Sequence, residues 1–223
     1  LPELKLVLLK KQAILKGWLK LLQMNGNLFA RSALLQACLS FMTIYATQFG
    51  SQTVAINSLL MQFFLFISFS LDGVAFALES LVGNSLGQKK QKRLVAYIVQ
   101  GIKIGLCFAL AYTVFYFLTV DLIIWMLTDI DSLKLALADY HIWIVIMPMS
   151  CFLSFLFDGV FVGLGWDKKM RNSMLIAALV FFSVILIFSQ YESIFSNHVL
   201  WGAFTSFMLA RGVSQGVMLR RSL

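Results

Sequence analysis

The sequence predicts an all-α polytopic membrane protein. Of its 223 residues, 60% are hydrophobic and only 13% are charged, a composition too apolar for a soluble domain of this length. Long apolar runs separate the charged segments, and each is long enough for a membrane-spanning helix, which needs roughly 17 to 25 residues. Six such runs follow an amphipathic first segment, so six transmembrane helices are expected.

Residues 1–27 predict an amphipathic connector helix on the anionic inner leaflet. Apolar side chains such as Leu8 and Trp18 share one side, and lysines such as Lys16 share the other. An ordinary connector with a solvated lysine face is the alternative interpretation. The residues at 25–27, Asn-Gly-Asn, predict a break before the first span. Because the chain opens on Leu1 and shows no signal peptide, we expect further sequence upstream.

A six-helix transmembrane lobe is predicted over residues 28–223. Its first span is predicted over residues 29–49. Small polar residues recur along this span at steps of three and four, which places them on one helical face. They are Ser32, Gln36, Ser40, Thr43 and Thr47. Such a stripe is typical of a seam between two membrane helices or of the wall of a polar cavity. Both interpretations stay open from the sequence.

The second and third spans are predicted over residues 53–82 and 94–120. Asp72 and Glu79 lie two helical turns apart in the second span, on the same side. Glu79 is near the basic segment that follows and can also extend to the interface, whereas Asp72 has no such exit. In the third span, Gly101 and Gly105 have the spacing of a helix-packing motif.

The fourth span, predicted over residues 140–166, carries the strongest indication of function. Asp158 lies about two turns from its basic end, and a charged carboxylate at bilayer depth costs roughly 2.5–3.5 kcal/mol on insertion scales. Such a group must face protein or water. Ser154 lies one turn earlier, and Gly159 and Gly163 predict close helix approach. Pro148 interrupts the helix near its middle and suggests a gate.

The remaining spans are predicted over residues 173–189 and 199–218, and the basic residues set their orientation. Positive charges gather in the leader, the loop after the second span, the loop after the fourth span and the tail, whereas the alternate loops offer only Lys134. Because cytoplasmic loops carry the excess of Lys and Arg, both termini are predicted to be cytoplasmic in a bacterial inner membrane.

A short internal repeat links the two acidic spans. The segment 68–74, Ser-Phe-Ser-Leu-Asp-Gly-Val, aligns with 154–160, Ser-Phe-Leu-Phe-Asp-Gly-Val. Both spans run in the same direction, so Asp72 and Asp158 are expected at similar depth. The hypothesis is a water-filled cavity that both acids line.

Several other functions are excluded or disfavoured. The net charge of +8 does not indicate nucleic-acid binding, because the basic residues lie between apolar runs and fit a membrane surface better. The three cysteines share no metal-ligand spacing, so neither a metal nor another cofactor is expected. Residues 212–216 match the G-x-S-x-G motif, but that motif needs a strand-to-helix turn and here falls in an apolar helix. No enzyme activity is therefore expected.

Together these motifs resemble the C-terminal half of multidrug and toxic-compound extrusion (MATE) transporters. The resemblance rests on Asp72-Gly73 followed by Glu79, on residues 83–87, and above all on 157–163 with 170–174. It covers essentially the whole chain. It implies one six-helix lobe of a two-lobed transporter with a central cavity, whose partner is a missing N-terminal lobe or a second copy of the chain.

By resemblance, the expected function is efflux of small organic cations in exchange for a coupling cation. The resemblance implies coupling-cation or substrate binding at Asp158, supported by Asp72, Glu79, Gln36 and Ser154. Some family members carry a Glu in the first span where this chain offers Gln36, which favours H⁺ over Na⁺. Two alternatives are a membrane scaffold without transport and a flippase for lipid-linked substrates.

Overall fold

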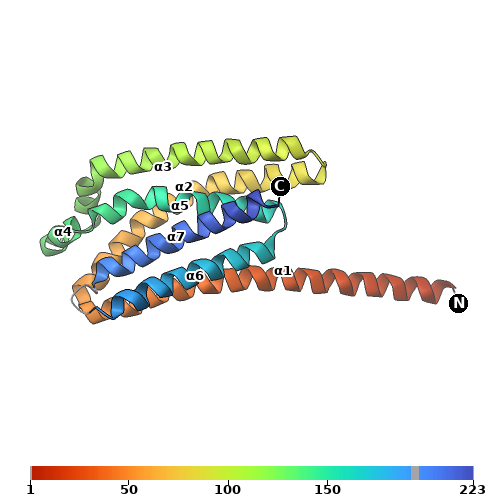
Figure 1. Cartoon of the computed structure of the whole chain (residues 1–223), viewed down its shortest axis with the longest axis horizontal. Helices are drawn as coiled ribbons and strands as arrows, with labels where there is room; N and C mark the ends of the chain where they lie inside the picture. The colour runs from red at the N-terminus through yellow and green to blue at the C-terminus, as the bar shows by residue number, and fades with distance from the viewer. Residues whose placement is uncertain (1, 192–195, 223) are drawn as a thin grey trace.

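The computed structural model describes residues 2–191 and 196–222, and the side chains of residue 18 and of all described residues from 22 onward. These residues form helices and turns (Figure 1). In chain order the helices are α1 (Pro2–Ala46), the 3₁₀ turn η1 (Thr47–Phe49), α2 (Ser51–Gly87), α3 (Gln91–Leu127), α4 (Asp131–Ala138), α5 (His141–Gly163), α6 (Asp167–Ser189) and α7 (Asn197–Arg220).

Five segments among the described residues are long and apolar enough to cross a membrane. They are Leu22–Phe49, α2, α3, α5 and α6. A helix also covers the predicted sixth span, but α7 does not reach that level of hydropathy, because it carries Arg211, Gln215 and several small residues. Three of its polar side chains, Asn197, Arg211 and Gln215, are buried inside the bundle, where a polar group needs partners from protein rather than lipid. The six-span topology stays a prediction.

Helix α1 is continuous, so the predicted break at residues 25–27 is wrong. The Asn27 side chain is buried and bonds to the start of α6: its amide donates to Asp167, and its carbonyl accepts from Arg171 at 2.8 Å. This tertiary contact keeps Asn27 helical, although its residue type favours turns. The N-terminal part of α1 projects beyond the bundle (Figure 1). Most side chains of the predicted amphipathic face lie outside the described part of the chain.

Helices α2 and α5 pack most closely, and glycines make this possible. A Cβ at Gly159 would collide with the Ala75 carbonyl, and one at Gly163 would lie 2.6 Å from the Glu79 carbonyl oxygen. Gly101 and Gly105 of α3 similarly leave room for Leu78 and Leu156. The close approach predicted from both glycine pairs is confirmed.

The other helices cover this central pair. Helix α3 packs on α2 and α5 from one side, and α7 packs on α5. Helix α6 packs between α7 and α1 (Figure 1). Near the end of the bundle that holds η1, the buried amides of Asn57 (α2) and Asn197 (α7) bond reciprocally at 2.9 and 2.8 Å, and Trp201 donates to Asn57 at 2.7 Å. The two chain termini lie toward the opposite end (Figure 1).

Candidate functional site

The side chain of Asp158 lies inside the bundle and accepts hydrogen bonds from two other helices. Its Oδ2 atom accepts from Arg31 Nη2 of α1 at 2.5 Å and from Arg211 Nη2 of α7. Its Oδ1 atom accepts from Gln215 Nε2, also of α7, at 2.7 Å. We call these four residues the Asp158 cluster. The carboxylate is satisfied on both oxygens, and every partner is a nitrogen donor.

Helix α7 brings two cluster residues to α5 because it approaches that helix closely. Arg211 and Gln215 are four positions apart, so both project from one face of α7. Gly212 lies against α5, where a Cβ would be only 3.2 Å from the Ser154 backbone nitrogen. The small residue at 212 therefore allows the long side chains at 211 and 215 to reach Asp158.

The two arginines of the cluster differ in their access to water. The Arg211 side chain is 2% exposed and that of Asp158 is 11% exposed, whereas the Arg31 side chain is 25% exposed. Two guanidinium groups share one carboxylate, which leaves the cluster with one excess positive charge. Asp72 lies within electrostatic range of Asp158, Arg31 and Arg211, so the four charged groups balance.

No hydrogen bond is described between Asp72 and Asp158, and the cavity that the internal repeat suggests for these two acids stays a prediction. Asp72 is half-buried on α2. Glu79, two turns further along α2, lines a separate pocket of about 490 Å³ together with Ser80 and Val162. Among the described contacts, neither Asp72 nor Glu79 makes a hydrogen bond or ion pair.

Three other predicted site residues do not meet Asp158 through a described side-chain contact. The Ser154 hydroxyl is fully buried and donates to the Cys151 carbonyl at 2.7 Å, so it offers no open surface. Pro148 is buried inside α5, which remains one helix across it. Gln36 is exposed, bonds to Ser40 at 3.4 Å, and lines a pocket of about 270 Å³.

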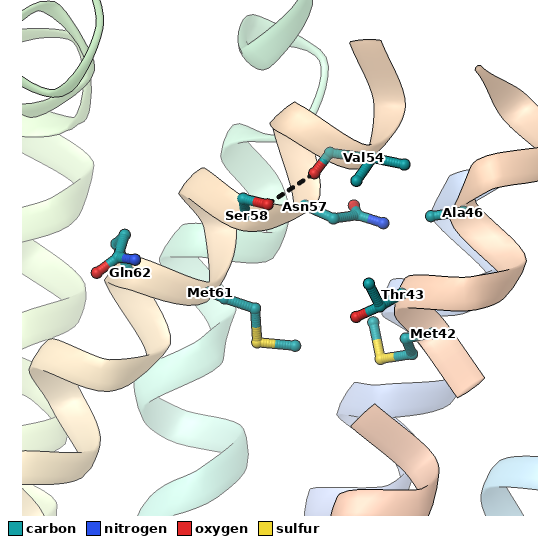
Figure 2. A pocket seen from close by; sticks show the side chains of 8 residues that line it. All are labelled: Met42, Thr43, Ala46, Val54, Asn57, Ser58, Met61 and Gln62. Atoms are coloured by element: carbon teal, nitrogen blue, oxygen red, sulfur yellow. Dashed lines mark hydrogen bonds between the residues drawn. The ribbon is translucent and has the colours of Figure 1, made fainter. Parts of the chain in front are cut away.

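The polar stripe of the first span faces open space. Of its five residues, four are exposed and Ser40 is partly buried, so none of the described helices forms a seam over them. Figure 2 shows Met42 and Thr43 of α1 across from Asn57 and Met61 of α2. Together with neighbouring side chains they line a pocket of about 260 Å³. Thr43 is the stripe residue that lines this pocket, and both interpretations of the stripe stay open.

Sequence reasoning missed Arg31, Arg211 and Gln215. The sequence does contain a feature that marks the two arginines. Both lie inside predicted spans, where a charged residue requires a partner. Gln215 and Ser214 both lie within the G-x-S-x-G match at residues 212–216. The structure places that match inside α7, where the Ser214 hydroxyl donates to the Arg211 carbonyl at 3.0 Å, so the motif forms no nucleophile turn.

Comparison with known proteins assigns the chain to a family. The family MatE matches residues 28–189. The chain belongs to the MatE family. It is 33% identical over 202 residues to DNA damage-inducible protein F of Escherichia coli (strain K12). That match covers 91% of this chain and 43% of the E. coli protein.

Two solved structures share the fold. One is a MOP superfamily transporter from Pyrococcus furiosus Vc1 (DSM3638), described as having a binding pocket of reversed polarity; its TM-score is 0.72 at 18% identity. The other is an outward-facing multidrug resistance MATE family transporter, with a TM-score of 0.71 at 19% identity. Each match covers 86% of this chain and 43% of the other.

MatE membership confirms several predictions at the level of the family. The chain is a multi-pass helical membrane protein of a transporter family, and the family consists of transporters rather than enzymes. The chain spans less than half the length of the relatives that it matches. Among the described residues, no group of three His, Cys, Asp or Glu side chains is placed to hold a metal ion.

Proposed function

We propose that the chain is the C-terminal lobe of a proton-coupled antiporter that exports small organic cations across the bacterial inner membrane. Both termini face the cytoplasm in this proposal, and a second lobe, from an N-terminal half or a second copy, completes the cavity. The Asp158 cluster carries the proposal, because a buried acid between two cations is an element whose protonation changes the local charge balance.

Protonation of Asp158 would release Arg31. A neutral carboxyl leaves two guanidinium groups close together in a medium of low dielectric constant, where like charges repel strongly. Arg211 is enclosed by protein, but the Arg31 side chain is 25% exposed and sits on α1 at the edge of the bundle. Arg31 is therefore the group that moves, and α1 loses its ion pair with α5.

The released guanidinium couples the proton to the substrate. In the charged state the cluster and Asp72 balance, and the free carboxylates of Asp72 and Glu79 attract a cation. In the protonated state the cavity gains one positive charge, which disfavours the bound cation. Asp158 then acts through Arg31 rather than as a direct ligand of the substrate. Exchange requires that the substrate cation bind with different affinity to the charged and the protonated state of Asp158.

The chemistry around Asp158 supports H⁺ over Na⁺. A hard cation such as Na⁺ requires several oxygen ligands, as Ca²⁺ and Mg²⁺ do. All described partners of Asp158 are instead N–H donors, which compete with a metal cation for the carboxylate lone pairs. A proton needs only one of those lone pairs.

The test is proton-driven efflux of ethidium from vesicles that contain the protein in its membrane assembly. Asp158→Asn should abolish efflux driven by a pH gradient, because its side chain cannot alternate between charged and neutral forms. Asp129→Asn, which changes an exposed acid between α3 and α4, is the matched control and should leave efflux unchanged. Undiminished efflux by Asp158→Asn would remove this residue from the mechanism.

The second candidate is a flippase for lipid-linked substrates that carry anionic groups. The two arginines favour it, since Arg31 and Arg211 place positive charge in the bundle next to one acid. The Pyrococcus relative, whose pocket is described as reversed in polarity, shows that pocket charge varies within this fold. Binding of an anionic lipid analogue with no ethidium efflux would favour this candidate.

The third candidate is a membrane scaffold without transport, in which the Asp158 ion pairs only hold the bundle together. A stable assembly that transports neither ethidium nor a lipid analogue, with or without a co-expressed partner lobe, would favour it.

A further inference from the structure

Three buried atoms of the Asp158 cluster have no hydrogen-bond partner among the described residues: Nε of Arg31, Nε of Arg211 and Oε1 of Gln215. Oε1 of Gln215 is the one acceptor among these three atoms. Gln215 is fully buried, and its Nε2 atom donates to Asp158, but its Oε1 atom meets no donor. Leaving a buried acceptor unpaired costs about 1–3 kcal/mol. Buried polar atoms are therefore nearly always paired, and an unpaired one needs an explanation, such as a second state in which the atom has a partner.

We infer that Gln215 is a positioning residue that hydrogen-bonds Asp158 in both of its protonation states. This inference rests on the proposed proton coupling. When Asp158 is charged, the amide N–H of Gln215 donates to Oδ1, as the structure shows. When a proton binds to Oδ1, that oxygen becomes a donor and requires an acceptor, and the amide carbonyl can supply it.

A rotation of the amide group makes the exchange possible without repacking. Turning the last carbon–carbon bond of the Gln215 side chain by half a turn exchanges the nitrogen and oxygen positions, which are nearly equal in size. Oε1 then accepts from the Oδ1–H group. The amide gains and loses no proton. In each state one end of the amide makes a hydrogen bond with the carboxyl group and the other end is unpaired. The free-energy cost of the unpaired buried atom is therefore similar in the two states.

Other side chains of the cluster cannot play this part. Arg31 and Arg211 are donors only, so they stabilise the charged carboxylate and offer nothing to a carboxyl proton. Ser154 lies outside the cluster, one turn earlier on α5, and its described hydrogen bonds go to Cys151 and Met208 rather than to Asp158. Among the described hydrogen-bond partners of Asp158, Gln215 alone can both donate and accept.

The test is pH-difference infrared spectroscopy of the purified protein in lipid. The carbonyl stretch of protonated Asp158 is identified by its loss in Asp158→Asn. Gln215→Met has nearly the same shape and no amide, so the Asp158 band should move to higher frequency, as expected for a carboxyl group that lacks an acceptor. Ser214→Ala is the matched control on α7, because its hydroxyl bonds only to its own helix among the described contacts, and should leave the band in place.

Gln215→Asn gives a second route if the methionine variant does not fold. It keeps a polar amide but is one methylene too short to reach the carboxyl group directly, so the band should again move upward. A band that stays in place in a folded variant overturns the inference and leaves the proposed function intact. A wild-type protein with no Asp158 band at any pH overturns both, since Asp158 then takes up no proton.

Discussion

Arg31 and Arg211 donate to the same oxygen atom of Asp158, although they come from the first and last helices of the chain. One carboxylate therefore joins α1, α5 and α7. The two arginines are not equivalent, because Arg211 is enclosed by protein and Arg31 reaches water. This difference separates their expected contributions to stability and to coupling.

Arg211→Met should destabilise the protein by about 3 kcal/mol or more. Removing one partner from a buried ion pair leaves an uncompensated charge, and such losses are typically about 3–5 kcal/mol. Because Arg31 still pairs with Asp158, we expect the loss in unfolding free energy to lie toward the lower end of that range. Reversible unfolding in mixed detergent micelles measures the change. The double variant Arg211→Met with Asp158→Leu should be more stable than Arg211→Met alone. A double variant that is less stable than Arg211→Met would contradict this account.

Arg31→Gln should change stability less than Arg211→Met does. Arg211 and Gln215 still satisfy Asp158, and the partly exposed guanidinium loses less when its partner is removed. The same unfolding measurement compares the two variants. The proposed coupling predicts in addition that ethidium efflux by Arg31→Gln no longer depends on the pH gradient. Efflux that keeps the wild-type dependence would show that Arg31 is not the moving charge.

Gly159→Ala should destabilise the α2–α5 pair by about 1–3 kcal/mol. The added methyl group would collide with the Ala75 carbonyl, and overpacking of a tight core costs energy of this order. Gly73→Ala on α2 is the matched control, since a Cβ there meets no atom within 4 Å. That control should be neutral or stabilising, because alanine favours helix over glycine. Equal effects at both positions would argue against close packing at Gly159.

Asn57→Ala should cost about 1–3 kcal/mol, because it leaves the buried Asn197 amide and the Trp201 indole N–H without their described partner. Ser58→Ala, the neighbouring exposed position whose hydroxyl bonds only to the Val54 carbonyl in the described contacts, should change stability little. Thermal unfolding followed by helical circular dichroism compares the two. A loss at Ser58 as large as that at Asn57 would contradict the role given to the amide pair.

The features that the sequence predicts correctly are those with a periodic or local physical cause. Apolar composition predicts membrane helices, and the spacing of Gly159 and Gly163 predicts close approach. A carboxylate at bilayer depth predicts that Asp158 is covered by protein. The identity of its partners depends on which helices meet, and this requires the tertiary arrangement of α1, α5 and α7. The same dependence explains the wrong break at Asn27, whose bonds to α6 outweigh its local preference.

The modest hydropathy of α7 has a consequence for how the chain is synthesised. An arginine at the centre of a nascent span costs roughly 2.5–3.5 kcal/mol during insertion, and α7 carries Arg211 without enough apolar residues to offset it easily. Its carboxylate partner lies on α5, which leaves the ribosome earlier. We therefore expect α7 to enter the bilayer by joining α5 and the other helices that were released there before it.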